Sequence, residues 1–286
     1  MLVLLLIILP LLFAILTIAA GEKQAKNIAV TGALLTFAAG LFGFIQFTQN
    51  AASEIFTYHV KWIQALGADF YLKADGISII LVLLTVLLTP FIIQSAQGRS
   101  IRNPKAYFSL ILLMQSALLG VFLAKDALLF YVFWELALIP IYLIALIWGG
   151  QGRKKITLKF FLFTLFGSLF MLLAIIFVWL HNPTRSFSLY EFYKVGAQLS
   201  AHQQLFVFIA FYLAFAIKIP IFPLHTWQPD TYVVAPTQGT MLLSGIMLKM
   251  GTFALIVWLI PIAPLGWKIA SKYVIILSVI SVVYGS

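Results

Sequence analysis

The sequence of 286 residues contains no cysteine and few charged side chains. The lack of cysteine excludes thiol catalysis, thiolate-bound zinc, cysteine-held iron–sulfur clusters and disulfides. The four histidines are scattered along the chain, so they do not predict a haem or metal site. Charged residues make up 9% of the chain, whereas an ordinary soluble domain has about 25%. A chain with so little charge does not fit a single soluble core.

Hydrophobic residues make up 63% of the chain, and the few polar groups present could not cover them in water. This composition indicates a polytopic membrane protein in a lipid bilayer. Eighteen Lys and Arg against eight Asp and Glu give a net charge of +10. We attribute the basic excess to loops that follow the positive-inside rule, and we expect no nucleic-acid partner.

A membrane-spanning helix needs about 20 mostly apolar residues. The sequence therefore predicts an all-α, polytopic membrane fold with about nine transmembrane helices, and no soluble domain separates them. The predicted helices are residues 1–20, 28–47, 75–95, 106–124, 127–148, 156–180, 204–222, 236–260 and 269–286.

The short loops after segments 1–20, 75–95 and 127–148 are basic and lie on one side of the predicted bundle. We assign that side to the cytoplasm, because these loops carry Lys23, Lys26, Arg99, Arg102, Lys105, Arg153, Lys154 and Lys155. The N-terminus then lies outside. Within the longer outer segments, residues 187–195 are expected to form a short interfacial helix.

Two features interrupt the pattern of uniform spans. The seventh segment, 204–222, contains Lys218-Ile-Pro220-Ile-Phe, and Pro223 follows directly. Each proline removes a backbone donor and disrupts the helix near it, and broken helices occur in membranes where they are buried in protein or line a wet cavity. The chain also stops at Ser286 inside an apolar segment, so we expect the native chain to continue.

Most charges fall in loops or at helix ends, but Glu135, Lys218 and Lys249 lie within predicted spans. A charge at the bilayer centre costs roughly 2.5–3.5 kcal/mol on insertion scales, so such residues pair, reach water or face the protein interior. Lys218 lies at the predicted break, and Lys249 has glycines on both sides that permit close helix approach. A Glu–Lys pair that breaks and re-forms lets a lysine release and regain a proton, which the second lysine accepts through water.

The alternative to this switch is a static ion pair that only locks two helices together. One carboxylate cannot neutralise two lysines, so Lys249 argues against a static pair. Two roles stay open for His225, which follows the break. It relays protons between the two lysines, or it only hydrogen-bonds the broken helix.

Other ionisable residues fit simpler roles. Lys159 lies one turn into the segment 156–180, and snorkelling to the cytoplasmic surface is favoured over a role in proton uptake. Asp75 and Asp126 fit the N-termini of helices. Asp230 fits a structural role in the connection that follows the break.

Two long stretches of sequence resemble a known family. FYVFWELALIPIYLIALIWG at 130–149 resembles the fifth helix of the antiporter-like subunits of respiratory complex I, the NADH:quinone oxidoreductase. AFAIKIPIFPLHTWQPDTYVVAPTQGTMLLSGIMLKMGTFAL at 214–255 resembles their seventh and eighth helices, and the PLHTWxPD…APT pattern is most similar to the subunit M group. The number and order of the helices match along the whole chain.

The resemblance implies a fold of about fourteen helices around two inverted five-helix repeats, an arrangement also seen in transporters. Residues 1–95 would be the N-terminal helices, 96–260 the first repeat with its proton half-channel, and 261–286 the start of the next helix. The resemblance also assigns roles. Glu135 and Lys218 would form the ion pair, Lys249 would be the central lysine, and His225 matches the family histidine after the break. The second repeat would lie beyond the end of this sequence.

The resemblance implies a proton-translocating subunit in a bacterial inner membrane, driven by quinone reduction elsewhere in the complex. The sequence has no nucleotide-binding loop, dinucleotide-binding glycine motif or metal-ligand cluster. NAD, FMN, iron–sulfur clusters and quinone are therefore expected in partner subunits, and neighbouring antiporter-like subunits of the membrane arm are the expected partners. The alternatives are a subunit of a multisubunit cation/proton antiporter or membrane-bound hydrogenase, and a non-conducting, truncated membrane scaffold.

Overall fold

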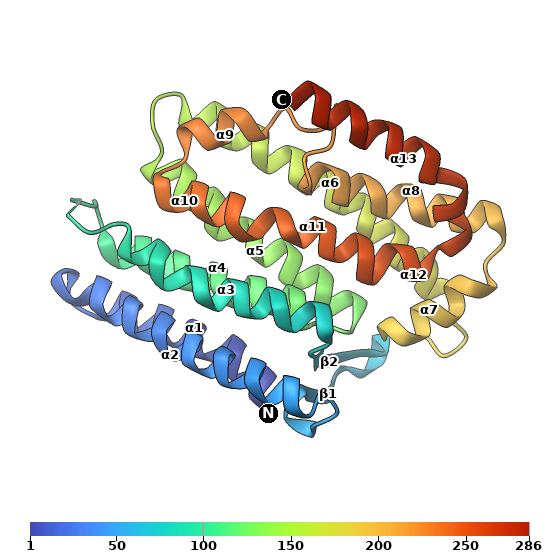
Figure 1. The fold of residues 1–286 in the computed structure, drawn as a ribbon, viewed down its shortest axis with the longest axis horizontal. Coiled ribbons are helices and arrows are strands. Elements are labelled where there is room, and N and C mark those ends of the chain that lie inside the picture. The colour runs from blue at the N-terminus through green and yellow to red at the C-terminus, as the bar shows by residue number, and fades with distance from the viewer. Residues whose placement is uncertain (99, 286) are drawn as a thin grey trace.

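Long helices lie side by side in the computed structural model, which describes residues 1–98 and 100–285 (Figure 1). Within the described residues, nine helical segments are long and apolar enough to cross a membrane, as the sequence predicts. They are α1 (Leu2–Ala19), α2 (Glu22–Gln49), α3 (Gly76–Gln94), α4 (Pro104–Leu123), α5 (Ala127–Trp148), α6 (Arg153–Leu180), α8 (Ala201–Lys218), the segment Thr237–Ile262 and α13 (Pro264–Gly285). Arg99 and Ser286 lie outside the described residues.

Several helices begin earlier than the sequence predicts, and the two longest of them are α2 and α6. α2 starts at Glu22 and α6 at Arg153, and each has 28 residues. At 1.5 Å per residue such a helix is about 42 Å long, which exceeds the hydrocarbon core of about 30 Å. Its first turns can therefore lie in the headgroup region, and several basic residues expected in loops are helical. We call this side of the bundle the basic end, which carries Lys23, Lys26, Arg102, Lys105, Arg153, Lys154 and Lys155.

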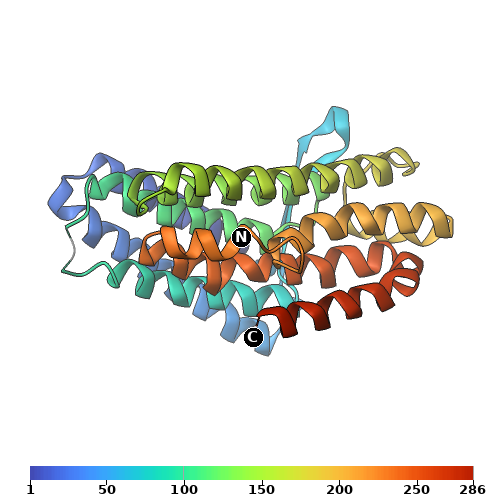
Figure 2. The ribbon, with the colours of Figure 1, turned by 90° about the horizontal axis from the view of Figure 1, so that it is seen from above.

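A β-hairpin at the opposite end departs from the predicted all-helical chain. β1 (Thr57–Ile63) and β2 (Ala68–Lys73) pair antiparallel through the 3-10 turn η2 (Gln64–Leu66), and a second 3-10 turn, η1 (Glu54–Phe56), precedes them. Gly67 closes the turn at φ 71°, which a glycine adopts without steric cost. The hairpin projects from the bundle in Figure 2. We call this side the hairpin end.

Acidic caps fix the starts of two helices at the hairpin end. Asp75 accepts hydrogen bonds from the backbone N–H groups of Ile77 (3.1 Å) and Ser78 (2.8 Å) at the start of α3. Asp126 accepts from two N–H groups of α5, each at 3.0 Å, and from the N–H of Asp69 in β2, also at 3.0 Å. Both caps agree with the sequence analysis. The third bond of Asp126 also ties the hairpin to the bundle.

The helix that follows α6 and the short α7 (Leu189–Gln198) is broken. α8 ends at Lys218, turns occupy residues 219–227, and α9 (Gln228–Val234) follows. α7 covers most of the short helix expected at 187–195. The next span combines α10 (Thr237–Leu242), α11 (Leu248–Ala254) and α12 (Ile260–Ile262), which are separated by two π-helical turns, η3 (Leu243–Met247) and η4 (Leu255–Leu259). The sequence analysis did not predict these π turns.

One glycine makes a backbone contact that brings α7 against α12. A Cβ atom added at Gly196 would lie 1.9 Å from the carbonyl oxygen of Ile262 and 2.9 Å from its carbonyl carbon. Backbone atoms cannot move aside as a flexible side chain does, so α7 and the end of the span can meet here only at a glycine.

We expect Gly196→Ala to lower the free energy of unfolding by about 1–3 kcal/mol, as overpacking does in other cores. Gly76→Ala is the matched control, because nothing lies within 4 Å of a Cβ atom at Gly76. Thermal unfolding in detergent measures the difference. Equal melting temperatures for the two variants would contradict the close contact.

The buried cap Asp126 predicts a pH dependence of stability. Burial raises the pKa of Asp126 to about 6, although three backbone N–H groups act in the opposite direction. The folded state therefore binds this proton more tightly than the unfolded state, whose pKa is near 3.8. The stability that protonation contributes is full below the unfolded pKa and is lost as the pH rises through about 6.

Lowering the pH from 7 to 5 should stabilise the wild type relative to Asp126→Asn by about 1.4 kcal/mol, which corresponds to one pKa unit. Asparagine keeps the helix cap and does not titrate. Melting curves of both proteins at the two pH values measure the effect. A constant difference between them would show that the pKa of Asp126 is not raised.

Candidate functional site

Glu135 lies near the middle of α5 with one carboxylate oxygen buried. Its Oε1 atom has no hydrogen-bond partner. Tyr131 on the same helix, Ser168 on α6 and Lys218 at the end of α8 surround the carboxylate. A buried polar atom without a partner costs free energy, so this oxygen can accept a proton, a water molecule or a lysine that moves toward it.

Lys218 is the last residue of α8 and is 2% exposed. Its Nζ atom lies over the ring of Trp134, 5.4 Å from the ring centre. The position at the C-terminus of a helix favours a cation, because the helix dipole is negative there. The ammonium is therefore held by a ring and a helix end, in a place where bulk water does not reach it.

The direct ion pair expected between Glu135 and Lys218 is open in this structure. None of the ion pairs among residues 1–98 and 100–285 joins them, although the two charges are close enough to interact. The physical reason lies with Trp134, whose ring takes the lysine in place of the carboxylate.

Gly251 brings α11, the helix that carries the second lysine, Lys249, against the end of α8. A Cβ atom at Gly251 would lie 2.6 Å from Cγ1 of Ile219 and 3.1 Å from the carbonyl oxygen of Phe215. Lys249, two residues earlier on α11, donates a hydrogen bond from Nζ to the carbonyl oxygen of Ser244 in the π turn η3. π turns often occur at functional sites, and here one supplies the carbonyl oxygen that accepts the hydrogen bond of Lys249.

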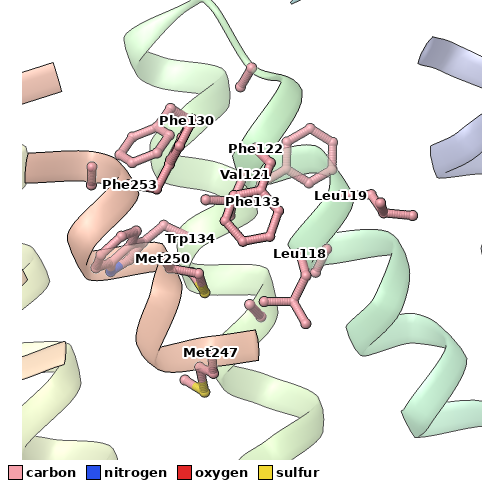
Figure 3. Close-up of a cluster of buried hydrophobic side chains, with 14 of the residues drawn as sticks. Leu118, Leu119, Val121, Phe122, Phe130, Phe133, Trp134, Met247, Met250 and Phe253 are labelled. Carbon is pink, nitrogen blue, oxygen red and sulfur yellow. The ribbon is translucent and has the colours of Figure 1, made fainter. Parts of the chain in front are cut away.

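Buried aromatic rings from α4, α5 and the span Thr237–Ile262 pack together as an aromatic layer, and several of them are labelled in Figure 3. Phe122 and Phe253 pack edge to face with centroids 5.3 Å apart. Phe130 stacks on Trp258 at 4.4 Å and contacts Trp134 at 5.6 Å. All five rings are buried, and Phe130 lies one turn into α5, close to the hairpin end.

The turns that follow α8 have side-chain partners. Nε1 of Trp227 donates to the carbonyl oxygen of Ile217 at 2.9 Å, and the N–H of Phe222 donates to Oγ of Ser281 on α13 at 2.9 Å. Such bonds satisfy backbone groups that the interruption at Pro220 would otherwise leave bare. The peptide bond before Pro223 is cis.

His225 lies in the same turns and faces α13 rather than the two lysines. Its ring stacks on Phe222 at 5.6 Å and meets Tyr284 edge to face at 5.2 Å. Its Nδ1 atom is buried without a hydrogen-bond partner. Among the described residues no hydrogen bond joins His225 to Lys218 or Lys249. A relay through His225 therefore requires water or movement.

Lys159 reaches the broken helix from α6. Its Nζ atom donates to the carbonyl oxygen of Thr226 at 2.8 Å and pairs with Asp230 at 3.1 Å. Both charged side chains are exposed. Lys159 thus holds the α8–α9 turns on the side that faces the basic end, as well as being a candidate group for proton uptake. Asp230 has the structural contact that the sequence analysis favours.

Three features of the site were not identified from the sequence. The contact of Trp134 and the burial of Lys125 depend on distant segments, and the π turn η3 is a local feature that the sequence did not reveal. Of these three features, only the burial of Lys125 left a signal in the nearby sequence. Only residues 124–126 separate α4 from α5, and a connection this short leaves Lys125 little room to project into solvent.

Two further features of the described chain bear on cofactor binding. Within residues 1–98 and 100–285, no group of three or more His, Asp or Glu side chains could hold a metal ion. A groove of about 570 Å³ between α6 and α8 is lined only by Leu, Ile and Phe side chains. Its surface suits a lipid tail and lacks the polar groups that orient a cofactor.

Known proteins resemble this chain in sequence and in fold. The family described as NADH:quinone oxidoreductase/Mrp antiporter, TM, matches residues 124–286. NADH-quinone oxidoreductase subunit M of Rickettsia conorii is 38% identical, over 98% of this chain and 58% of that protein. The chain therefore spans about three fifths of the length of this relative.

Solved structures place the same helices in the same order. A chain of respiratory complex I from Thermus thermophilus with bound NADH superposes with a TM-score of 0.85 and 33% identity, over 97% of this chain and 56% of that chain. A chain of the Mrp complex from Dietzia sp. superposes with a TM-score of 0.79 and 18% identity, over 92% of this chain and 29% of that chain, which shows a shared fold only. With the family match over more than half of its length, this multi-pass membrane chain belongs to the NADH:quinone oxidoreductase/Mrp antiporter family.

Proposed function

We propose that the chain is the N-terminal portion of a proton-translocating subunit in the membrane arm of NADH:quinone oxidoreductase. The observation that carries the proposal is the open pair of Glu135 and Lys218. A carboxylate oxygen without a partner lies near a lysine that is 2% exposed and held by a tryptophan ring. A static lock between helices would use the ion pair closed, with its charges mutually satisfied.

The pathway that we propose uses the groups of the first repeat, residues 96–260. Protons arrive from the basic end near Lys159 and reach Lys218 beside the break. Closing of the Glu135–Lys218 pair retains the proton on Lys218, and opening lets it pass toward Lys249 on α11. His225 lies next to the break, and water is needed for it to take part.

The energy for transfer comes from elsewhere in the complex. The chain holds no redox centre in this proposal, and NAD, FMN, iron–sulfur clusters and quinone belong to partner subunits. Neighbouring antiporter-like subunits are its membrane partners. The positive-inside rule places the basic end in the cytoplasm and the N-terminus outside a bacterial inner membrane.

A second function has specific support. The matching family includes Mrp antiporters, and the fold of an Mrp chain superposes over 92% of this chain. A cation/proton antiporter would use the same buried groups without electron transfer. The scaffold alternative has less support, because a scaffold could replace Glu135, Lys218 and Lys249 with leucine at lower insertion cost.

We expect Glu135→Gln and Lys218→Ala each to abolish most proton pumping while the complex still assembles and oxidises NADH. Each substitution removes one of the two charges that the switch needs. Fluorescence quenching in inverted membrane vesicles measures pumping, and native gels measure assembly. Wild-type pumping in both variants would overturn the pathway.

The matched controls are Glu191→Gln and Lys194→Ala, which remove an ion pair of the same types. That pair lies on α7 with Nζ 2.7 Å from Oε1, and its lysine is exposed. Both controls should pump like the wild type. Sodium-driven proton flux in vesicles without NADH or quinone would favour the antiporter over the oxidoreductase.

A further inference from the structure

Lys125 is a buried lysine that the pathway above does not use. It lies in the connection between α4 and α5, and its side chain is 1% exposed. Its backbone is fixed on both sides, since its N–H donates to the carbonyl oxygen of Tyr71 and its own carbonyl accepts from the N–H of Leu189, both at 2.8 Å. These bonds from the hairpin and α7 leave the amine pointing into the bundle.

The partner of this amine has contact with solvent. Nζ of Lys125 lies 2.5 Å from Oδ2 of Asp75 and 3.4 Å from Oγ of Ser78. The other oxygen of Asp75 caps α3. The side chain of Asp75 is 39% exposed at the hairpin end. The pair therefore has one member in the protein interior and one that water reaches.

The interior member faces the aromatic layer. Nζ of Lys125 lies 5.9 Å from the ring centre of Phe253, which packs against Phe122. Phe253 follows Lys249 by four residues on α11, which is about 6 Å along the helix axis. One layer of rings thus separates the central lysine of the proposed pathway from the Asp75–Lys125 pair.

We propose that the Asp75–Lys125 pair is a proton-binding site through which the first repeat exchanges protons with the hairpin end, an inference that rests on the proposed function. Lys249 releases its bond to Ser244, turns toward Phe253 and transfers a proton to the neutral amine of Lys125 as the aromatic ring moves aside. One N–H bond breaks at Lys249, and one forms at Lys125. Lys125 then passes a proton to Oδ2 of Asp75, which releases it to water.

The charges around the pair keep Asp75 ionised and weaken the hold of Lys125 on its proton. Burial lowers the pKa of Lys125 against the opposing pull of Asp75, and Lys73 lowers it further. Burial raises the pKa of Asp75, but the ammonium of Lys125 and hydrogen bonds from Ser78 hold it below its usual value. Tyr193 also faces Asp75, and burial raises its pKa, so it stays a neutral phenol.

The neighbouring acid does not compete for the amine. The carboxylate of Asp126 is turned toward the N–H groups of Asp69, Leu128 and Leu129. Asp75 is therefore the carboxylate that decides whether Lys125 keeps its proton. A structural brace between α3 and α5 would need the charge of Lys125, whereas proton exchange also needs the amine to deprotonate.

Lys125→Arg separates these two roles. Arginine keeps the positive charge and the ion pair with Asp75 but does not lose its proton in proteins. In membrane vesicles that contain the assembled complex with its full-length chain, we expect normal NADH oxidation and proton pumping slower by about a hundredfold or more, the usual scale for loss of one acid–base group. Lys73→Arg, in β2, is the matched control and should pump normally.

Asp75→Asn is the second variant, because asparagine keeps one oxygen for the helix cap but presents an amide NH2 group to Lys125 and binds no proton. It should also slow pumping without loss of assembly. Normal pumping in both Lys125→Arg and Asp75→Asn would overturn the proposal, and so would failure of both variants to assemble, which would assign the pair to the fold. Glu135→Gln is measured in parallel. Normal pumping in Glu135→Gln refutes the proposed function itself. If Glu135→Gln stops pumping while Lys125→Arg and Asp75→Asn pump normally, only the role of Asp75 and Lys125 is refuted.

Discussion

A charged group inside a membrane protein needs a partner or water, and the arrangement of this site follows from that constraint. Glu135 and Lys218 are close but not bonded, and each has a weaker substitute for its partner. The lysine has the face of Trp134 and the end of α8. The carboxylate has Tyr131 and Ser168 beside it, while one oxygen stays unsatisfied. Neither group therefore has the direct charged partner that it would have in a closed pair.

The helices around the pair are shaped to permit such movement. The break after Lys218 ends α8 in the protein interior, and Trp227 stabilises it by a bond to a free carbonyl. The π turn η3 offers a carbonyl to Lys249, and Gly251 lets α11 approach the end of α8. The aromatic layer lies toward the hairpin end, while the turns held by Lys159 face the basic end. In the proposed pathway, these contacts give the buried charges different access to the two sides.

Residue types and their periodicity predicted much of this structure. Apolar runs located the nine spans, the two prolines located the break, and the scarcity of charge made Glu135, Lys218 and Lys249 conspicuous. Side-chain contacts between distant segments were beyond such reasoning. The ring of Trp134 reaches Lys218 only because α5 and α8 lie together, and Lys125 pairs with an aspartate fifty residues away. The hairpin was missed because its strands are short and neither shows a strict alternation of buried and exposed residues, so hydrophobic patterning did not mark them.

The central claim is that Glu135 changes its protonation or its partner when the complex works. Infrared difference spectra of the purified complex, recorded as quinone is reduced, test it most directly. The account predicts a change in the carboxyl stretching region for the wild type that is absent in Glu135→Gln. Identical spectra for the two proteins would contradict it, because the carboxylate would then keep one protonation state and one environment throughout the reaction.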